Sequence, residues 1–172
     1  MNVRRARPAD AAAIGAVHVA AWRSAYPGIL PEAYLARLSP MRQARHYEAA
    51  IRGGEIVHVA VAEGRVVGFA TASRAWGSQV AEGEIQTLYV LDDWRDRGLG
   101  RALMQVSGAA LAALGCRDAF LWVLRDNPSR WFYARLGGRP AAEGMVRVTG
   151  VAVPQTAFVW SPIGLLVASA GA

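Results

Sequence analysis

The sequence predicts a single domain of mixed α/β (α+β) class, with a mostly antiparallel sheet and helices on both of its faces. Three observations predict this class. Apolar residues recur at helical spacing in most of the chain up to Gly53-Gly54, and at strand spacing after it. Glu63-Gly64 joins two strand-like runs as a hairpin turn does. A strand–loop–helix–strand passage in the middle of the chain is where we expect parallel pairing.

The N-terminal part is predicted to contain one strand and two helices. A short strand covers Asn2–Arg7, and Asp10 is the expected N-cap of the first helix. An irregular or short helical connection follows over Ile29–Leu38. Ser39-Pro40 begins the second helix, because a capping residue is followed by proline at the first helical position, and Gly53-Gly54 ends it.

The middle of the chain is predicted to hold three strands and a helix. Glu55–Ala62 and Arg65–Ser73 form the hairpin, and Glu82–Val90 is the third strand. A glycine-rich loop then leads into a helix from about Gly100 to Leu114, which Gly115 ends.

The C-terminal part is predicted to add three strands and one helix. Asp118–Arg125 is apolar at successive positions, as in a strand that helices cover on both faces. Asn127-Pro128 begins the helix and Gly137-Gly138 ends it. The last strands are expected near Met145–Val151 and Gln155–Ser161.

Composition excludes several classes of protein. With 172 residues and 53% hydrophobic residues, the chain is too apolar for a disordered protein. Its apolar stretches are shorter than the roughly 20 residues that cross a bilayer, and the N-terminus lacks a signal-peptide pattern. The single Cys116 allows no internal disulfide, which fits a reducing compartment, so we expect a cytoplasmic protein without a membrane partner.

The net charge of +6 comes from arginine, since the 19 basic residues include no lysine. The arginines are scattered rather than clustered, which disfavours a nucleic-acid partner. Arginine does suit a small polyanionic ligand, whose phosphates a guanidinium binds with two hydrogen bonds. His18, His46 and His58 lie far apart in the sequence and lack metal-ligand spacing, so no metal site is predicted.

The loop Arg95-Asp96-Arg97-Gly98-Leu99-Gly100 stands between a predicted strand and a predicted helix. Unpaired amides and the dipole at a helix start attract phosphate, and glycines let an anion approach the backbone. A Walker-type P-loop requires lysine, which the chain lacks, and a dinucleotide fingerprint requires a small residue where Leu103 stands. From the residues alone, a glycine-rich turn without a ligand stays an alternative.

The surrounding residues resemble the GNAT superfamily of N-acetyltransferases. Glu84–Val90 followed by Asp93–Met104 looks like its central motif, and Asn127-Pro128 with Trp131–Gly137 looks like its second motif. The segment from Arg4 to Pro31 also matches, so the resemblance covers roughly residues 3–161. One departure is Gly138, where the family usually has an aromatic residue, and we expect this to weaken local packing.

The resemblance implies acetyl-coenzyme A as co-substrate, without a metal, bound where two central parallel strands splay apart. The pyrophosphate is expected on the backbone of Arg95, Asp96, Arg97, Gly98, Leu99, Gly100 and Arg101. The pantetheine arm is expected to pair with the strand Leu88-Tyr89-Val90, and Asn127 to bond to the coenzyme.

Acetyl transfer requires a base, because an ammonium has no lone pair with which to attack. Glu84 begins the strand along which the thioester is expected, so it is the candidate base, with Glu82 as a weaker substitute and a water chain as another. Tyr133 matches the family tyrosine that protonates the departing thiolate, and it also belongs to the expected coenzyme site. An exposed strand-end carboxylate and a packing tyrosine are the structural alternatives.

The resemblance indicates an enzyme that acetylates a primary amine of a small molecule by direct attack in a ternary complex. Acetylation of a protein N-terminus or lysine is one alternative, and a coenzyme A-binding regulatory protein without turnover is another. Trp22, Tyr26 and Trp76 are the candidate contacts of the acceptor amine.

Residues 1–172 are predicted to form this one domain, with residues 162–172 as an additional tail. The apolar stretch Ile163–Ala172 has three interpretations: an added edge strand, a homodimer contact or a disordered end.

Overall fold

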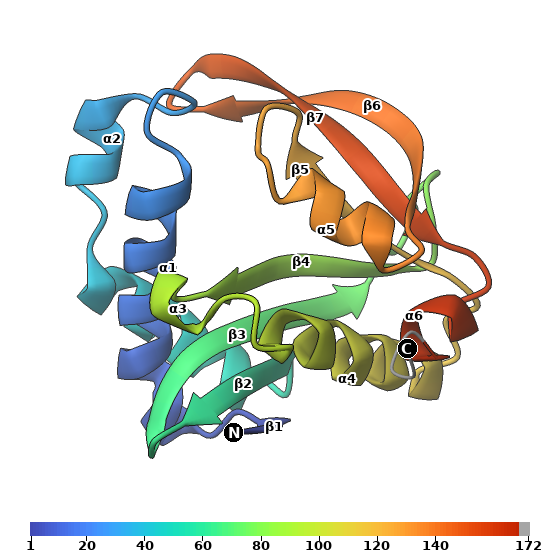
Figure 1. The fold of residues 1–172 in the computed structure, drawn as a ribbon, viewed down its shortest axis with the longest axis horizontal. Helices are drawn as coiled ribbons and strands as arrows, with labels where there is room; N and C mark the ends of the chain where they lie inside the picture. Colours follow the sequence, from blue (N-terminus) through green and yellow to red (C-terminus); the bar gives the residue numbers. More distant parts are fainter. Residues whose placement is uncertain (169–172) are drawn as a thin grey trace.

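The computed structural model describes residues 1–168 and contains one seven-stranded sheet with helices on both faces (Figure 1). The strand order is β1-β2-β3-β4-β5-β7-β6, in which β4 and β5 are parallel and the other neighbours antiparallel. The strands are β1 (Asn2–Arg5), β2 (Ile56–Ala62), β3 (Arg65–Arg74), β4 (Gly83–Val90), β5 (Ala119–Leu124), β6 (Arg139–Val148) and β7 (Val151–Trp160). The helices are α1 (Ala11–Ala25), α2 (Glu32–Ala36), α3 (Pro40–Arg52), α4 (Leu99–Ala113), α5 (Arg130–Arg135) and α6 (Gly164–Ala168). The predicted mixed, mostly antiparallel sheet is confirmed.

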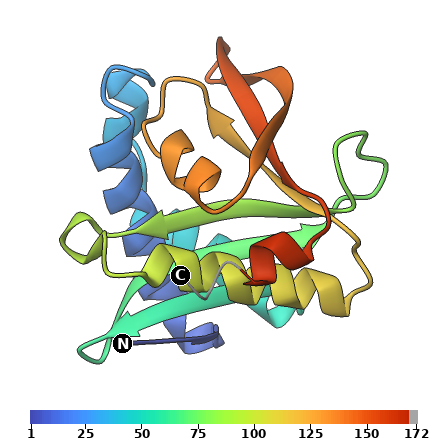
Figure 2. The same cartoon turned by 45° about the vertical axis from the view of Figure 1, so that its right-hand side comes forward.

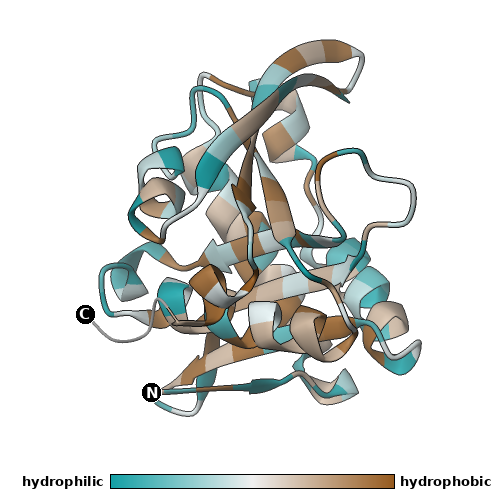
Figure 3. Cartoon of the chain, turned by 90° about the vertical axis from the view of Figure 1, so that its right-hand side faces the viewer, coloured by the Kyte–Doolittle hydropathy of each residue, from teal (hydrophilic) through white to brown (hydrophobic). Residues whose placement is uncertain are grey.

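Two apolar layers hold the helices against the sheet. On one face, Ile14 of α1 and Tyr47 of α3 pack against Phe69 of β3. On the other face, Leu103 of α4 packs against Ala70, the next residue of β3, because successive side chains of a strand point to opposite faces. Figure 2 shows α4 in front of the strands and α1 behind them. Figure 3 shows brown, apolar residues on the strands between these layers.

Several predicted boundaries are confirmed by the local hydrogen bonds and dihedral angles. Ser39 Oγ accepts a hydrogen bond from the backbone N–H of Arg42 at 3.3 Å, so it caps α3 as expected. Glu63 and Gly64 have φ angles of 51° and 73°, the left-handed pair of a tight hairpin turn. The short helix α2 lies within the predicted connection Ile29–Leu38.

The N-terminal segment differs from the prediction. The strand ends at Arg5, and Pro8–Asp10 form a 3-10 turn before α1. The carboxylate of Asp10 does not cap α1, because it binds the Arg4 guanidinium at 2.8 Å and accepts a hydrogen bond from the Arg7 backbone at 2.7 Å. The bond to Arg4 lowers the pKa of Asp10. Asp10 thus stands at the predicted N-cap position of α1, but its side chain makes no cap hydrogen bond, since an ion pair holds that carboxylate.

The C-terminal hairpin also corrects two predictions. The strand predicted near Met145–Val151 exists as β6, but it runs from Arg139 to Val148, because Thr149 and Gly150, with φ angles of 50° and 82°, form the turn between β6 and β7. Helix α5 begins at Arg130 rather than at Asn127-Pro128. The side chain of Asn127 shapes the preceding turn instead.

The tail after β7 contains a short helix in residues 164–168, so an edge strand there is wrong. Leu166 of α6 is fully buried, and a Cβ on Gly108 of α4 would lie 2.9 Å from its side chain. The missing side chain at Gly108 therefore lets α6 dock on α4. The rest of the tail, residues 169–172, lies outside the described residues, and a homodimer contact stays a prediction. No helix within residues 1–168 is long and apolar enough to cross a membrane.

The expected packing defect at Gly138 is absent. A Cβ at this position would lie 2.7 Å from Cζ2 of Trp160, whose side chain is fully buried and donates a hydrogen bond to the Leu136 carbonyl at 3.0 Å. The indole of Trp160 thus occupies the space that an aromatic side chain at position 138 would need.

We predict that Gly15→Ala destabilises the protein by about 1–3 kcal/mol, the usual range for overpacking a close contact. A Cβ on Gly15 would lie 2.4 Å from the Pro40 carbonyl oxygen and 2.7 Å from the Ala44 nitrogen, which are backbone atoms of α3. Urea unfolding measures the change. Gly164→Ala is the matched control, because nothing lies within 4 Å of the added Cβ. Equal unfolding midpoints for the two variants would contradict this account of the α1–α3 contact.

Candidate active site

A cleft lies where β4 and β5 separate. Figure 1 shows the two strands diverging. The two strands pair at only two positions, Gly83 with Ala119 and Glu84 with Phe120, whereas β5 pairs with β7 along its whole length. From Ile85 onward, β4 is hydrogen-bonded to β3 alone, so one edge of its backbone is open. The cleft has a volume of about 1020 Å³.

A β-bulge at Gln86 decides which side chains of β4 share a face. The register changes between the pairs Thr71–Thr87 and Ala72–Ile85, so Gln86 has no partner on β3. Without this extra residue, strict alternation would place residue 84 with Leu88, which packs toward α4. The bulge instead places Glu84 on the same face as Thr87, whose hydroxyl bonds to that of Thr71 at 2.8 Å. This is the face that α1 covers.

The predicted phosphate loop leads directly into α4. Asp96 and Gly98 have φ angles of 57° and 80°, and the helix begins at Leu99. Such left-handed positions turn successive backbone N–H groups toward one side, where the helix dipole also favours an anion. A Cβ on Gly100 would lie 3.2 Å from the ring of Phe132, so the glycine lets α5 approach the helix start.

Among the charged residues of this loop and the first turn of α4, Arg95, Asp96 and Arg101 line the cleft, and Arg97 does not. The guanidinium of Arg97 lies over the Trp94 ring, 4.8 Å from its centroid. Arg95 pairs with the Asp92 carboxylate at 2.8 Å.

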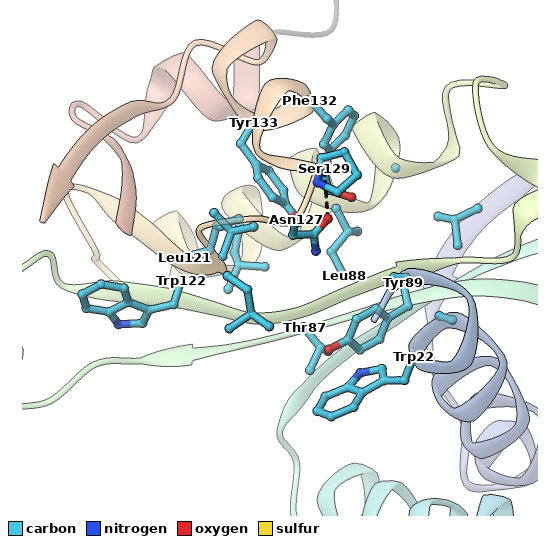
Figure 4. Close-up of a pocket in the computed structure, with 18 of the residues that line it drawn as sticks. Trp22, Thr87, Leu88, Tyr89, Leu121, Trp122, Asn127, Ser129, Phe132 and Tyr133 are labelled. Atoms are coloured by element: carbon cyan, nitrogen blue, oxygen red, sulfur yellow. Dashed lines mark hydrogen bonds between the residues drawn. The ribbon is translucent and has the colours of Figure 1, made fainter. Parts of the chain in front are cut away.

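Asn127 and Tyr26 connect two sides of the cleft. Asn127 is buried, and its Oδ1 accepts a hydrogen bond from the Ser129 backbone at 2.9 Å (Figure 4). Its NH2 group is therefore the donor that remains for the hydroxyl of Tyr26. Burial raises the pKa of Tyr26, while hydrogen bonds to Tyr89 and Asn127 act in the opposite direction.

Tyr133 points into the cleft from α5, on the same side of β4 as Asn127 and Leu88 (Figure 4). Its ring packs against those of Phe132, Phe158 and Trp160 with centroid distances of 5.3–6.5 Å. Burial raises the pKa of its hydroxyl, so Tyr133 stays protonated at neutral pH. A protonated, fixed hydroxyl can donate a proton or a hydrogen bond.

Glu84 lines the cleft at the point where β4 and β5 meet, and it is half-buried. Desolvation raises the pKa of its carboxyl group above the ordinary value. The weaker candidate, Glu82, lies outside the cleft, and two side-chain nitrogens of Arg117 bind its carboxylate. The guanidinium binds Oε1 and the Arg117 backbone N–H donates to Oε2, and these contacts lower the pKa of Glu82, so Glu82 is not placed to act as a base.

The three predicted acceptor contacts have different surroundings. Trp22 and Tyr26 line the cleft and meet edge to face, with ring centroids 5.0 Å apart. Trp76 does not line it. Its side chain is 83% exposed in the loop after β3, where the Arg74 guanidinium lies 4.9 Å from the ring centroid.

Sequence reasoning missed part of the cleft wall. Trp122 on β5 and Val146 and Val148 on β6 line the cleft, as do Phe132 and Arg135 of α5. The β6 residues reach it because β7 pairs with β5 and carries β6 back beside it. No local sequence pattern reveals that contact, since it depends on strand order. Phe132 and Arg135 stand within the second motif, which was the local signal that could have indicated them.

The cleft fits the coenzyme that the resemblance implies. Open backbone groups along Ile85–Val90 can hydrogen-bond an extended amide-containing arm, as an added strand does. Gly98 and Gly100 at the start of α4 line the cleft together with Arg95 and Arg101, which suits a pyrophosphate.

Comparisons with known proteins agree with this geometry. The model of the acetyltransferase (GNAT) family matches residues 19–138. The uncharacterized N-acetyltransferase YuaI of Bacillus subtilis is 30% identical over 170 residues, which are 96% of both chains.

Two solved structures share the fold at low identity. A ribosomal-protein-alanine N-acetyltransferase from Brucella melitensis superposes with a TM-score of 0.73 at 20% identity, covering 94% of this chain and 99% of that one. A phosphinothricin acetyltransferase from Sinorhizobium meliloti in complex with acetyl-CoA gives 0.70 at 22% identity, covering 94% and 88%. The match to the family model and the identity to YuaI, together with the splayed strands and the loop at α4, establish that the chain belongs to the GNAT family and is an acetyl-CoA-dependent N-acetyltransferase.

Proposed function

We propose that the protein transfers the acetyl group of acetyl-CoA to the primary amine of a small molecule, by direct attack in a ternary complex. The observation that carries this proposal is the single cleft that Glu84, Tyr133 and the amides before α4 share. Both reactants can therefore lie together, and no side chain needs to hold the acetyl group in between. Holding two reactants in one orientation removes much of the entropic barrier of a bimolecular step.

For the coenzyme, the proposed contacts lie on the α4 side of the sheet. The pyrophosphate would sit on the amides of residues 95–100, the pantetheine arm along the open edge of Leu88-Tyr89-Val90, and Asn127 beside that arm. When bound, acetyl-CoA supplies a thioester carbonyl that an amine can attack. Unpaired N–H groups of β4 are candidate donors to the oxyanion that develops.

For the amine, we propose Glu84 as the group that removes the proton. The raised carboxyl pKa moves it closer to that of the amine and so makes the carboxylate a better base. Its position on the α1 face separates it from the coenzyme contacts on the other face. Base and leaving group can thus be handled from opposite sides.

For the leaving group, we propose Tyr133 as the proton donor to the departing thiolate. The aromatic packing around its ring fixes the hydroxyl in one place. A thiolate is a tolerable leaving group without help, because a thiol pKa is about 8.5, so the acid adds to the rate without being indispensable.

A small acceptor is favoured over a protein one by the aromatic wall of the cleft. Trp22 and Tyr26 pack against each other and against the turn after α1 rather than forming an open, polar groove for a peptide. A coenzyme-binding protein without turnover would need neither Glu84 nor Tyr133 in the cleft. Their joint presence favours an active enzyme.

The first prediction from this site is that Gly100→Glu lowers the affinity for acetyl-CoA by at least about 100-fold, or about 2.7 kcal/mol. The new carboxylate would stand at the phosphate cradle, and its Cβ would press on the Phe132 ring at 3.2 Å. Titration calorimetry measures the affinity. Gly164→Glu adds the same group at the start of α6, in open space, and should bind as the wild type does. Unchanged affinity in folded Gly100→Glu would show that the loop does not hold the pyrophosphate.

The second prediction is that Tyr133→Phe lowers kcat about 10-fold to 1000-fold while affinity for acetyl-CoA stays nearly intact. The change removes the hydroxyl and keeps the packed ring. Steady-state assays of thiol release measure kcat. Tyr34→Phe is the matched control, because Tyr34 lies on α2 outside the cleft lining. Full activity of Tyr133→Phe would leave this tyrosine with a packing role only.

The third prediction concerns pH. Below its raised pKa the carboxyl group of Glu84 is protonated and cannot accept a proton, and above it the carboxylate can. We expect kcat/KM to rise with pH to a plateau, and Glu84→Gln to lower and flatten that rise. Glu82→Gln, which disturbs only the pair with Arg117, should keep the wild-type profile. An unchanged profile in Glu84→Gln would transfer the role of base to a water chain.

A further inference from the structure

The α1 side of the cleft has an apolar wall made from segments far apart in the sequence. One hydrophobic cluster joins the end of α1 and the turn after it to the end of β5 and to the β6–β7 hairpin. Seven residues of that cluster also line the cleft, and we call them the apolar wall: Trp22, Ala25, Tyr26, Leu30, Leu124, Val146 and Val148. Figure 1 shows the hairpin reaching across to the turn that follows α1.

Aromatic surface continues from this wall toward Glu84. Trp122 stands on the same face of β5 as Phe120, the residue that pairs with Glu84, and the two rings meet edge to face at 6.4 Å. The indole of Trp122 lies across Gly144 of β6, where a Cβ would come within 3.2 Å of it. Trp122 therefore gives the cleft an aromatic surface on the β5 side of the proposed base.

Charge is distributed unequally between the two sides of the cleft. Of the cleft-lining residues within 1–168, the acidic ones are Glu84 and Asp96 and the basic ones Arg95, Arg101 and Arg135. Arg101 and Arg135 come from α4 and α5, which pack on the face opposite to α1, and Arg95 and Asp96 come from the loop between β4 and α4, where Arg95 is already paired with Asp92. Among the described lining residues of α1, the turn after it, β4, β5 and the β6–β7 hairpin, Glu84 is the single charged group.

From this distribution we propose that the acceptor is a primary monoamine with an apolar or aromatic body, carrying neither a carboxylate nor a second ammonium group. The inference rests on the proposed function, since it concerns the same cleft and the same base. Glu84 would pair with the one ammonium group before the proton leaves, and the apolar wall with Trp122 would cover the body of the molecule.

Desolvation explains why other amines should be poor acceptors. A second ammonium group, as in a diamine or polyamine, would lie against the apolar wall without a carboxylate to pair with. The carboxylate of an amino acid would likewise lie against the apolar wall, whose residues offer no guanidinium to pair with it. A nonpolar body, by contrast, gains free energy by covering apolar surface.

Matched pairs of amines test the proposal. Hexylamine and 1,6-diaminohexane differ by one terminal ammonium, and 2-phenylethylamine and phenylalanine by one carboxylate. With acetyl-CoA saturating, we expect kcat/KM for the first member of each pair to be at least about tenfold higher, since a single poorly matched group already discriminates by that factor. Rates are compared at a pH where the carboxylate of Glu84 is ionised, with thiol release as the readout.

A designed carboxylate gives a second, independent readout. Val146→Glu places an acid in the apolar wall, and we expect the preference for hexylamine over 1,6-diaminohexane to fall about tenfold or more. Met145→Glu is the matched control. Met145 comes immediately before Val146 in β6, points to the opposite face and is 62% exposed. Val148→Glu repeats the test at a second wall position in case Val146→Glu fails to fold.

The outcomes separate the two proposals. Faster turnover of the diamine, of phenylalanine or of a short peptide with an N-terminal phenylalanine overturns the proposed acceptor class and leaves the enzyme an acetyltransferase. An unchanged preference in folded wall variants overturns it as well. Absence of turnover with every amine, by a protein that binds acetyl-CoA in calorimetry, overturns the proposed function itself and the acceptor class with it.

Discussion

The unequal pairing of β5 governs the whole functional side of the molecule. One edge of β5 is bonded to β7 along its full length, while the other edge meets β4 at only two positions. Since β5 follows the twist of its stronger partner, it diverges from β4 and leaves the β4 backbone open. The loop before α4, the turn holding Asn127 and helix α5 all face this gap. These three segments can therefore line one cleft because β4 and β5 diverge there.

The extra residue of the β4 bulge, Gln86, then determines which face of the sheet carries the proposed base. The bulge at Gln86 returns Glu84 to the α1 face, while Leu88 and the phosphate-binding amides stay on the α4 face. The charged groups proposed for the polyanion and the apolar wall proposed for the amine therefore lie at different sides of one cleft.

Local features of the site were predictable from the sequence, and distant ones were not. The loop Arg95–Gly100 and the turn at Asn127 are read from consecutive residues, because glycine, proline and asparagine act on their own backbone. The wall that Val146 and Val148 contribute depends on β7 crossing back to pair with β5, and no periodicity reports strand order. Asp10 stands at the N-cap position of α1 without capping it, because Arg4 binds its carboxylate. The predicted strand Met145–Val151 ran across the turn at Thr149, since a threonine gives a weak turn signal.

The contact between Gly138 and Trp160 links two positions that the fold keeps side by side. Because Trp160 fills the space 2.7 Å from a Cβ on residue 138, Gly138 cannot be replaced by a larger residue alone. A bulky ring at position 138 requires a smaller residue at position 160. A sequence that carries aromatic residues at both would have to move Tyr133, whose backbone oxygen also borders that space, and so disturb the proposed proton donor. An aromatic substitution at Gly138 therefore requires a second substitution that replaces Trp160 with a smaller residue.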